Sequence, residues 1–292
     1  MTISLGSLLA EEGIDPRTVI VMRHQPYEPR LRALFPSIAL EARDLYNAYQ
    51  SAHNSRAESA LSKASYLASF IADGAGRALF IGMYRVNGSV SVDRERWLDM
   101  PENQRLMGLG MLSWIEKDRT EALWFDLELM DFYQHWFGRL VVDWPPPERS
   151  WYRWADRNHF AVKAVHEENV LESPSVSWEQ IALSWDELSL LPRKLRQSLT
   201  HWRGVYLITD RSDGRQYVGS ACGAENLLGR WESYSKSGHG GNKLLKTRDR
   251  KNFVFSILQR VSPDMSSEEV IAIENSWKLR LRTRSPEGLN EN

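Results

Sequence analysis

Cysteine is almost absent from this sequence. Its 292 residues contain a single thiol, Cys222, which rules out an internal disulfide framework and is typical of a reducing compartment. A structural zinc site is also disfavoured, because one cysteine and seven scattered histidines do not give the usual ligand spacing. The 42% of hydrophobic residues instead predict a fold that is held together by ordinary apolar burial.

Long apolar runs are missing as well. No stretch reaches the roughly 18 apolar residues that a membrane-spanning helix requires. The first residues, MTISLGSLLAEEGIDP, have no basic region and no extended apolar segment, so they do not resemble a signal peptide. We therefore expect a soluble, cytoplasmic protein that has no membrane partner.

The formal net charge is only −1, and the charge is unevenly distributed. Residues 200–292 contain 15 Lys and Arg against 11 Asp and Glu, whereas residues 1–199 contain 22 against 27. This distribution favours a polyanionic partner for the C-terminal part of the chain. Chance alone could produce an imbalance of this size, so the charge only supports the arguments that come from motifs.

Short strands dominate the pattern of residues 1–172. Residues 40–51 have helical spacing, but residues 65–89 contain two apolar, β-branched runs around Gly74-Ala75-Gly76, which predict a hairpin. Most of the twelve tryptophans lie between Trp97 and Trp185. Further strand-like runs occupy residues 123–133, 136–144 and 159–168. These patterns predict a mixed, β-rich N-terminal domain, for which a small PUA-like pseudobarrel is one candidate.

Residues 173–202 are expected to link this domain to a second one. The small polar segment ESPSVS at residues 172–177 is typical of a linker. A connecting helix follows, because Ser184 and Glu187 form a capping-box pattern, and Pro192 is expected to break that helix. A second domain then covers residues 203–292.

The second domain opens with GVYLITDRSDGRQYVG, which reads as two strands joined by a turn at Asp213-Gly214. If the loop is residues 210–213, Tyr206 lies directly opposite Tyr217 on one face of the sheet. Gly204 and Gly219 flank the two tyrosines without side chains, which leaves room for another backbone to approach. The hairpin therefore predicts two neighbouring phenols.

Polar residues recur at defined places beyond the hairpin. Arg230 and Tyr234 are four residues apart, so they share one face of a helix. A glycine-rich loop, SGHGGN, and a third strand at residues 251–261 follow. A capping box then opens a helix in which Glu274 falls within the apolar stripe, where a carboxylate needs a cation or hydrogen-bond donors. Asn290 closes the pattern near the end of the sequence.

In this order, the residues resemble the GIY-YIG nuclease family over residues 204–292. The matching set is Tyr206, Tyr217, Arg230, Tyr234, Glu274 and Asn290, with Val in the middle of each tripeptide. The resemblance implies a small antiparallel sheet flanked by helices, and so an α+β chain overall. It also implies a DNA endonuclease that uses one Mg²⁺ or Mn²⁺ per active site.

Hydrolysis of a phosphodiester requires a base for water and neutralisation of charge on phosphorus and on the leaving oxygen. The resemblance implies that a tyrosine takes the proton; we expect Tyr206 to do so, with Tyr217 as the near-equal alternative. A neighbouring arginine and a metal ion favour the phenolate over the phenol. We expect Arg230 to clamp a phosphate oxygen and Tyr234 to hydrogen-bond phosphate or water.

A lone carboxylate, Glu274, suggests a one-metal site, because Mg²⁺ commonly keeps most of its waters. Asn290 is expected to orient Glu274 or a metal-bound water. His239 in the glycine-rich loop and Lys243 just after it are candidates for contacts with the DNA backbone. Each of these residues also has an ordinary structural explanation; for Glu274 it is an ion pair with Lys278 one turn later.

The N-terminal domain is too acidic to wrap DNA by charge alone. Its aromatic residues either fill a core or line a pocket that stacks a flipped or modified base. We therefore expect a nuclease whose N-terminal domain selects the target, as in a restriction or defence enzyme acting on modified DNA. A repair or branched-structure nuclease and a catalytically inactive DNA-binding protein are the alternatives. A homodimer on DNA would allow both strands to be cut.

Overall fold

The computed structural model describes residues 3–111, 118–172, 177–223, 226–237 and 241–291. The chain divides into two compact units, Met1–Ser173 and Pro174–Asn292. Within the described ranges, no helix has both the length and the apolar character needed to cross a membrane.

The N-terminal unit is built on a mixed sheet with the strand order β6-β1-β2-β3-β5-β7, in which β4 also pairs with β3. The strands β1 and β2 run parallel, and the others pair antiparallel. The predicted hairpin around Gly74-Ala75-Gly76 is confirmed as β2 and β3. The strands are β1 (Val19–His24), β2 (Tyr66–Ala72), β3 (Arg77–Asp93), β4 (Glu121–Leu129), β5 (Leu140–Asp143), β6 (Tyr152–Trp154) and β7 (Val162–Val165).

Both faces of the strand β1 are buried. Along β1, Val19 and Val21 join one apolar cluster, while Ile20 and Met22 join another on the opposite face. This alternation is what a strand between two packed layers requires. The β-rich mixed fold is therefore confirmed, while the PUA-like comparison stays a prediction.

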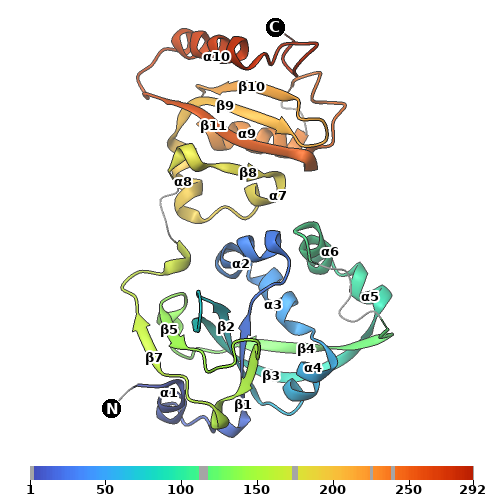
Figure 1. The fold of residues 1–292 in the computed structure, drawn as a ribbon, viewed down its shortest axis with the longest axis vertical. Helices are drawn as coiled ribbons and strands as arrows, with labels where there is room; N and C mark the ends of the chain where they lie inside the picture. The colour runs from blue at the N-terminus through green and yellow to red at the C-terminus, as the bar shows by residue number, and fades with distance from the viewer. Residues whose placement is uncertain (1–2, 112–117, 173–176, 224–225, 238–240, 292) are drawn as a thin grey trace. The chain divides into compact units, whose positions relative to one another are not determined.

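Helices surround the sheet (Figure 1), and the helix expected at residues 40–51 is present in two parts. The chain breaks at Ala42, whose φ of −135° and ψ of 66° are not helical. The helices are α1 (Leu5–Glu11), α2 (Pro29–Glu41), α3 (Arg43–Ser51), α4 (Ser55–Leu61), α5 (Arg94–Asp99) and α6 (Pro101–Gly108).

Two histidines are buried in the N-terminal unit. His24 ends β1 and His53 follows α3, and their side chains are 3% and 6% exposed. Burial lowers the pKa of His24 to about 3, helped by the neighbouring His53, and lowers the pKa of His53 to about 4. Both imidazoles are therefore neutral at pH 7.

This burial predicts that acid destabilises the N-terminal unit. Below a pH of about 6.5 the unfolded chain binds protons that the folded chain does not, so the free energy of unfolding falls as the pH falls. At pH 5 the expected loss is about 2 kcal/mol for each histidine. Urea unfolding at pH 7.5 and pH 5 measures it. The double variant His24→Gln/His53→Gln should lose this pH dependence, whereas His159→Gln, at an exposed position, should keep it; equal pH dependence in all three proteins would contradict the assignment.

The C-terminal unit has a four-stranded antiparallel sheet in the order β10-β9-β11-β8 (Figure 1). Part of the interval expected to be a linker joins this sheet as β8. The strands are β8 (Ala182–Ser184), β9 (Arg203–Asp210), β10 (Gln216–Ala221) and β11 (Phe253–Val261), and the helices are α7 (Trp185–Leu188), α8 (Arg193–His201), α9 (Asn226–Ser237) and α10 (Ser267–Leu281). The expected break near Pro192 lies between α7 and α8.

The helices α9 and α10 cover opposite faces of this sheet. Both pack against β9 and β10. Residues of α9 cluster with Tyr206 and Ile208. Trp277 of α10 instead donates a hydrogen bond to Gln259 of β11, whose backbone pairs with Val205. Because neighbouring residues in a strand point to opposite faces, α10 lies on the face away from Tyr206.

The register of the hairpin corrects one expectation. Tyr217 pairs with Ile208, and Tyr206 pairs with Gly219, so the two tyrosines are diagonal neighbours and not directly opposite. The strands end at Asp210 and Gln216, which makes the turn longer than the assumed loop of residues 210–213. The two rings still share a face, because paired positions and alternate positions both lie on one side of the sheet.

Gly204 and Gly219 of the hairpin each allow a close approach. A Cβ on Gly204 would collide with the backbone of β11 at Gln259, where β11 has a bulge. A Cβ on Gly219 would collide with the phenol of Tyr206, which crosses that position. The expected approach of another backbone is thus found at Gly204, whereas a side chain fills the space at Gly219.

Candidate active site

Three tyrosines meet between the sheet and α9. The hydroxyl oxygens of Tyr206 and Tyr234 lie 3.0 Å apart, at hydrogen-bond distance. The ring of Tyr234 also packs edge-on against the ring of Tyr217, with centroids 6.1 Å apart. Tyr234 therefore contacts both tyrosines of the hairpin. The sequence predicted only that Tyr206 and Tyr217 are neighbours.

Arg230 supplies a cation to this cluster. It lies one helical turn before Tyr234, and its Cζ is 5.8 Å from the centroid of that ring. Its positive charge also acts on the Tyr206 hydroxyl. The Nε of Arg230 is buried and has no hydrogen-bond partner in the part of the chain that the structure describes. Arg230 as a whole is only half-buried, so its guanidinium is within reach of an anionic group.

The three phenols differ in their exposure. Tyr206 and Tyr234 are 0% exposed, whereas Tyr217 is only partly buried. Burial raises the pKa of Tyr206, and the charge of Arg230 offsets this only in part. Burial, reinforced by the neighbouring phenols, also raises the pKa of Tyr234. Of the three hydroxyls, that of Tyr217 is the one that belongs to a side chain accessible to solvent.

Glu274 lies on α10, where it pairs with a lysine one turn later. Its Oε1 is 2.8 Å from Nζ of Lys278, and the two side chains are 14% and 8% exposed. In the described residues, no hydrogen bond or ion pair joins Glu274 to the tyrosine cluster. The structure thus brings four of the six predicted residues together and pairs the fifth with a lysine.

Asn290 lies at the free edge of β10. Its Oδ1 accepts a hydrogen bond from the backbone N–H of Val218 at 3.0 Å, and its Nδ2 donates to the Val218 carbonyl at 2.8 Å. The side chain is 2% exposed, so it acts as an extra strand residue that satisfies the edge. Its expected role toward Glu274 stays a prediction.

The two candidates for DNA contacts lie in or beside the glycine-rich loop. His239 falls outside the described residues. Lys243 is exposed, next to Asn242, whose side chain accepts hydrogen bonds from the backbone N–H groups of Leu244 and Leu245. The exposure of Lys243 is compatible with a phosphate contact, and that role also stays a prediction.

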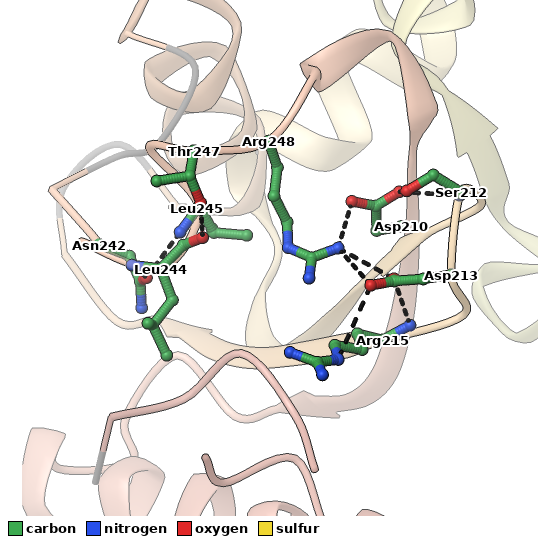
Figure 2. A network of polar contacts seen from close by, with 9 residues as sticks. All are labelled: Asp210, Ser212, Asp213, Arg215, Asn242, Leu244, Leu245, Thr247 and Arg248. Carbon is green, nitrogen blue, oxygen red and sulfur yellow. Dashed lines mark hydrogen bonds and ion pairs between the residues drawn. The ribbon is translucent and has the colours of Figure 1, made fainter. Parts of the chain in front are cut away.

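An ion-pair network that the sequence did not indicate holds the end of the hairpin (Figure 2). Nη1 of Arg248 lies 2.7 Å from Asp210 and 2.9 Å from Asp213. Although burial opposes it, hydrogen bonds from Ser212 and Arg248 hold the pKa of Asp210 below its usual value. The turn residues Asp210 and Asp213 give a local signal, but no pattern pointed to a partner 38 residues away. The network ties the turn to the segment after Lys243.

Residues 203–290 match the family model of the GIY-YIG catalytic domain. Two solved structures are similar to this chain: the catalytic domain of the homing endonuclease I-TevI and a mutant form of the same domain. Each is 24% identical; the match covers 30% and 31% of this chain and 95% and 94% of theirs, with TM-scores of 0.25 and 0.26, respectively. No curated protein matches the chain.

The matched range begins at the first residue of β9 and ends at Asn290, so it contains all six residues of the predicted set. Residues 203–290 are therefore identified as a GIY-YIG catalytic domain.

Proposed function

We propose that this chain is a metal-dependent DNA endonuclease in which Tyr217 takes the proton from the attacking water. The observation that carries this assignment is the arrangement of the phenols. Tyr217 is partly exposed, while Tyr206 and Tyr234 are buried behind it. A base must reach the proton that it removes, and a fully buried hydroxyl does not meet this condition.

The neighbours of Tyr217 are groups that can stabilise negative charge on its oxygen. To act as the base, Tyr217 must be a phenolate before it accepts the proton and a neutral phenol afterwards. In the phenolate state, the hydroxyl of Tyr234, whose ring packs against that of Tyr217, donates a hydrogen bond toward it. Tyr206 in turn donates to Tyr234, whose oxygen is 3.0 Å away. Arg230 contributes a positive charge beside both buried phenols. Hydrogen bonds and an opposite charge stabilise the charged form of a titrating group.

Arg230 also binds the scissile phosphate in this proposal. A guanidinium offers donors in a fixed fork that suits phosphate oxygens, and Arg230 is only half-buried, unlike Tyr206 and Tyr234. The negative charge that develops on phosphorus is thereby partly neutralised. Tyr234 is too deeply buried to contact phosphate in the present arrangement, so we assign it to the support of Tyr217.

Glu274 is the residue that would hold a divalent cation. A carboxylate oxygen is a ligand that Mg²⁺ and Mn²⁺ prefer. In the described chain, Lys278 is the only ion-pair partner of the Glu274 carboxylate. Within the described residues no group of three or more His, Cys, Asp or Glu side chains could hold a metal. One carboxylate therefore fits a single cation that keeps most of its waters. Such a cation supplies Lewis-acid stabilisation of the leaving oxygen.

We further propose that the N-terminal unit selects the target, as in a restriction or defence enzyme acting on modified DNA. The excess of acidic residues in residues 1–199 argues against backbone binding as its main contribution. A homodimer on DNA would place two active sites for cutting two strands, and light scattering with and without DNA tests for it; a monomer in both would exclude it.

Cleavage of a panel of DNA substrates tests this function. Wild-type protein with Mg²⁺ should nick or cut at least one of unmodified plasmid, DNA with modified cytosines and branched DNA, and a chelator should abolish the cutting. Glu274→Gln should lose the activity, because the amide cannot supply the same charge to the cation. Glu268→Gln, at an exposed position on the same helix, should keep it.

The outcome of the panel also separates the alternatives. Cutting of branched DNA alone would favour a repair nuclease over a target-selecting enzyme. If wild-type protein binds DNA but leaves every substrate intact with either cation, the endonuclease function is wrong and a DNA-binding protein remains.

A further inference from the structure

The N-terminal unit contains a cavity that no part of the proposed reaction uses. It lies at the end of β1, beside α3 and the segments that carry Trp97 and Trp151. Its volume is about 540 Å³, within the range of small-molecule binding sites, roughly 300–1,000 Å³. A pocket of this size can hold a small-molecule ligand.

Flat aromatic side chains form its walls. The rings of His24 and His53 are stacked, with an interplanar angle of 9° and centroids 6.1 Å apart. Trp151 lies 5.3 Å from His53, and Tyr49 stands edge-on to His24 at 5.7 Å. These residues and Trp97 all line the cavity. Such walls favour a flat ligand with a π-face.

Two buried polar atoms in the walls have no partner among the residues that the structure describes. These atoms are Nε2 of His24 and Nε2 of His53, and both side chains are more than nine-tenths buried. Buried polar atoms in native proteins are nearly always hydrogen-bonded. The imidazoles are neutral, since burial lowers the pKa of each, so each ring nitrogen donates or accepts according to its tautomer. The ligand therefore presents hydrogen-bonding atoms on its edge.

Other ligand classes fit these walls less well. Arg23 and Arg149 also line the cavity, but Glu28 and Glu148 line it too, and Glu148 lies 3.6 Å from Arg23, so the charge of the walls does not favour a free anion such as phosphate. A metal ion needs nitrogen atoms that converge on one point, whereas the two rings are nearly parallel, and no group of three ligating side chains exists among the described residues. A nucleobase has both the flat faces and the polar edge that the cavity requires.

An exposed tyrosine stands at the rim of the cavity. Tyr27 is 83% exposed, yet its backbone is fixed. The guanidinium of Arg32 donates to the carbonyl of Pro26 at 2.7 Å and to the carbonyl of Tyr27 at 2.8 Å. A ring held out in this way can enter a stack of bases, as aromatic and apolar side chains do in proteins that unstack DNA.

We propose that this cavity is a nucleobase pocket that receives one base extruded from DNA, with Tyr27 filling the position that the base leaves in the stack. Extrusion of a base costs a few kcal/mol, because the base loses its stacking. This cost is offset by stacking of the base on the cavity walls, by stacking of Tyr27 in the duplex and by two hydrogen bonds to the histidines. This inference deepens the proposed target selection and so rests on DNA being the substrate.

A short duplex with 2-aminopurine opposite cytosine, a weak pair, tests the pocket by fluorescence with the full-length chain in EDTA. Binding of wild-type protein should change the emission several-fold as the base leaves the stack. Trp151→Ala should abolish this change and weaken binding by about 10-fold or more. Tyr27→Ala should reduce the change in emission, and because Tyr27 is exposed this substitution should not disturb the fold. Tyr27→Phe should retain the full change in emission. An unaltered signal in both Trp151→Ala and Tyr27→Ala would overturn the proposal.

Free nucleosides form the second arm, followed by quenching of tryptophan fluorescence. Weak binding that Trp151→Ala removes, together with the duplex signal, supports the pocket. Binding of nucleosides without any duplex signal would overturn extrusion, and binding of neither would overturn the nucleobase assignment. Because these readouts need no cleavage, they separate the two proposals. If the enzyme cleaves DNA and the pocket variants change neither fluorescence signal, the nuclease function is supported and the pocket proposal is wrong.

Discussion

Tyr217→Phe lowers the rate of DNA cleavage by about 10²–10⁴-fold while the fold is kept, which is the expected effect of removing a general base. The substitution deletes one hydroxyl from a partly exposed ring. Tyr206→Phe removes a donor to Tyr234 but leaves the Tyr217 hydroxyl in place, so its expected loss is smaller, about 10-fold. Single-turnover cleavage at saturating protein measures both rates without interference from product release.

Two further variants make this comparison decisive. Tyr66→Phe removes a hydroxyl from a half-buried ring in the other unit and should cleave at the wild-type rate. Circular dichroism and urea unfolding show whether each variant is folded. A dead Tyr206→Phe beside an active Tyr217→Phe would reverse the roles of the two tyrosines.

The elements of the C-terminal unit could be predicted because their signals are local. The capping box at Ser266 and the apolar stripe through Val270 gave α10, and alternation gave β11. The register of the hairpin was not predictable, since it depends on a turn that Arg248 holds from 38 residues away. That contact is tertiary, and no short window of sequence contains it.

The candidate site was only partly readable for the same reason. Family order identified Tyr206, Tyr217, Arg230 and Tyr234, which the structure brings together. It could not show that Tyr206 is fully buried, because burial depends on how α9 packs over the sheet. Exposure, not identity, is what distinguishes the two tyrosines as bases.

The N-terminal unit carried weaker signals. Aromatic content suggested either a core or a pocket, and the structure contains both: Phe70 and Phe80 pack in a core, while Tyr49 and Trp151 line the cavity. The sequence did not indicate a role for His24 or His53, because a single histidine belongs to no periodic pattern or spaced motif. Their importance appears only when β1 and the end of α3 bring them together.

Gly219→Ala destabilises the C-terminal unit by about 1–3 kcal/mol, the usual cost of forcing extra volume into a packed site. A Cβ here would lie 2.6 Å from Cζ of Tyr206 and 2.9 Å from Cε1 of Tyr217, and would also collide with the Tyr206 hydroxyl. Tyr206 is 0% exposed and hydrogen-bonded to Tyr234, so it has little room to yield. Displacing the phenols should also lower cleavage by about 10²-fold, as misplacement of reacting groups does.

A double-mutant cycle shows whether the collision itself is the cause. In a Tyr206→Leu background the Tyr206 atoms that meet the new Cβ are gone and only Cε1 of Tyr217 stays close. Gly219→Ala should then cost about 1 kcal/mol less than it does beside Tyr206, which makes the two changes non-additive. Gly223→Ala is the matched control, since a Cβ there meets nothing within 4 Å, and it should leave stability unchanged or slightly higher. Urea unfolding of the four proteins gives the coupling energy. Gly219→Ala could instead cost the same free energy with Leu as with Tyr at position 206. The glycine would then be required by the backbone of β10, and a collision with the Tyr206 ring would not be the cause.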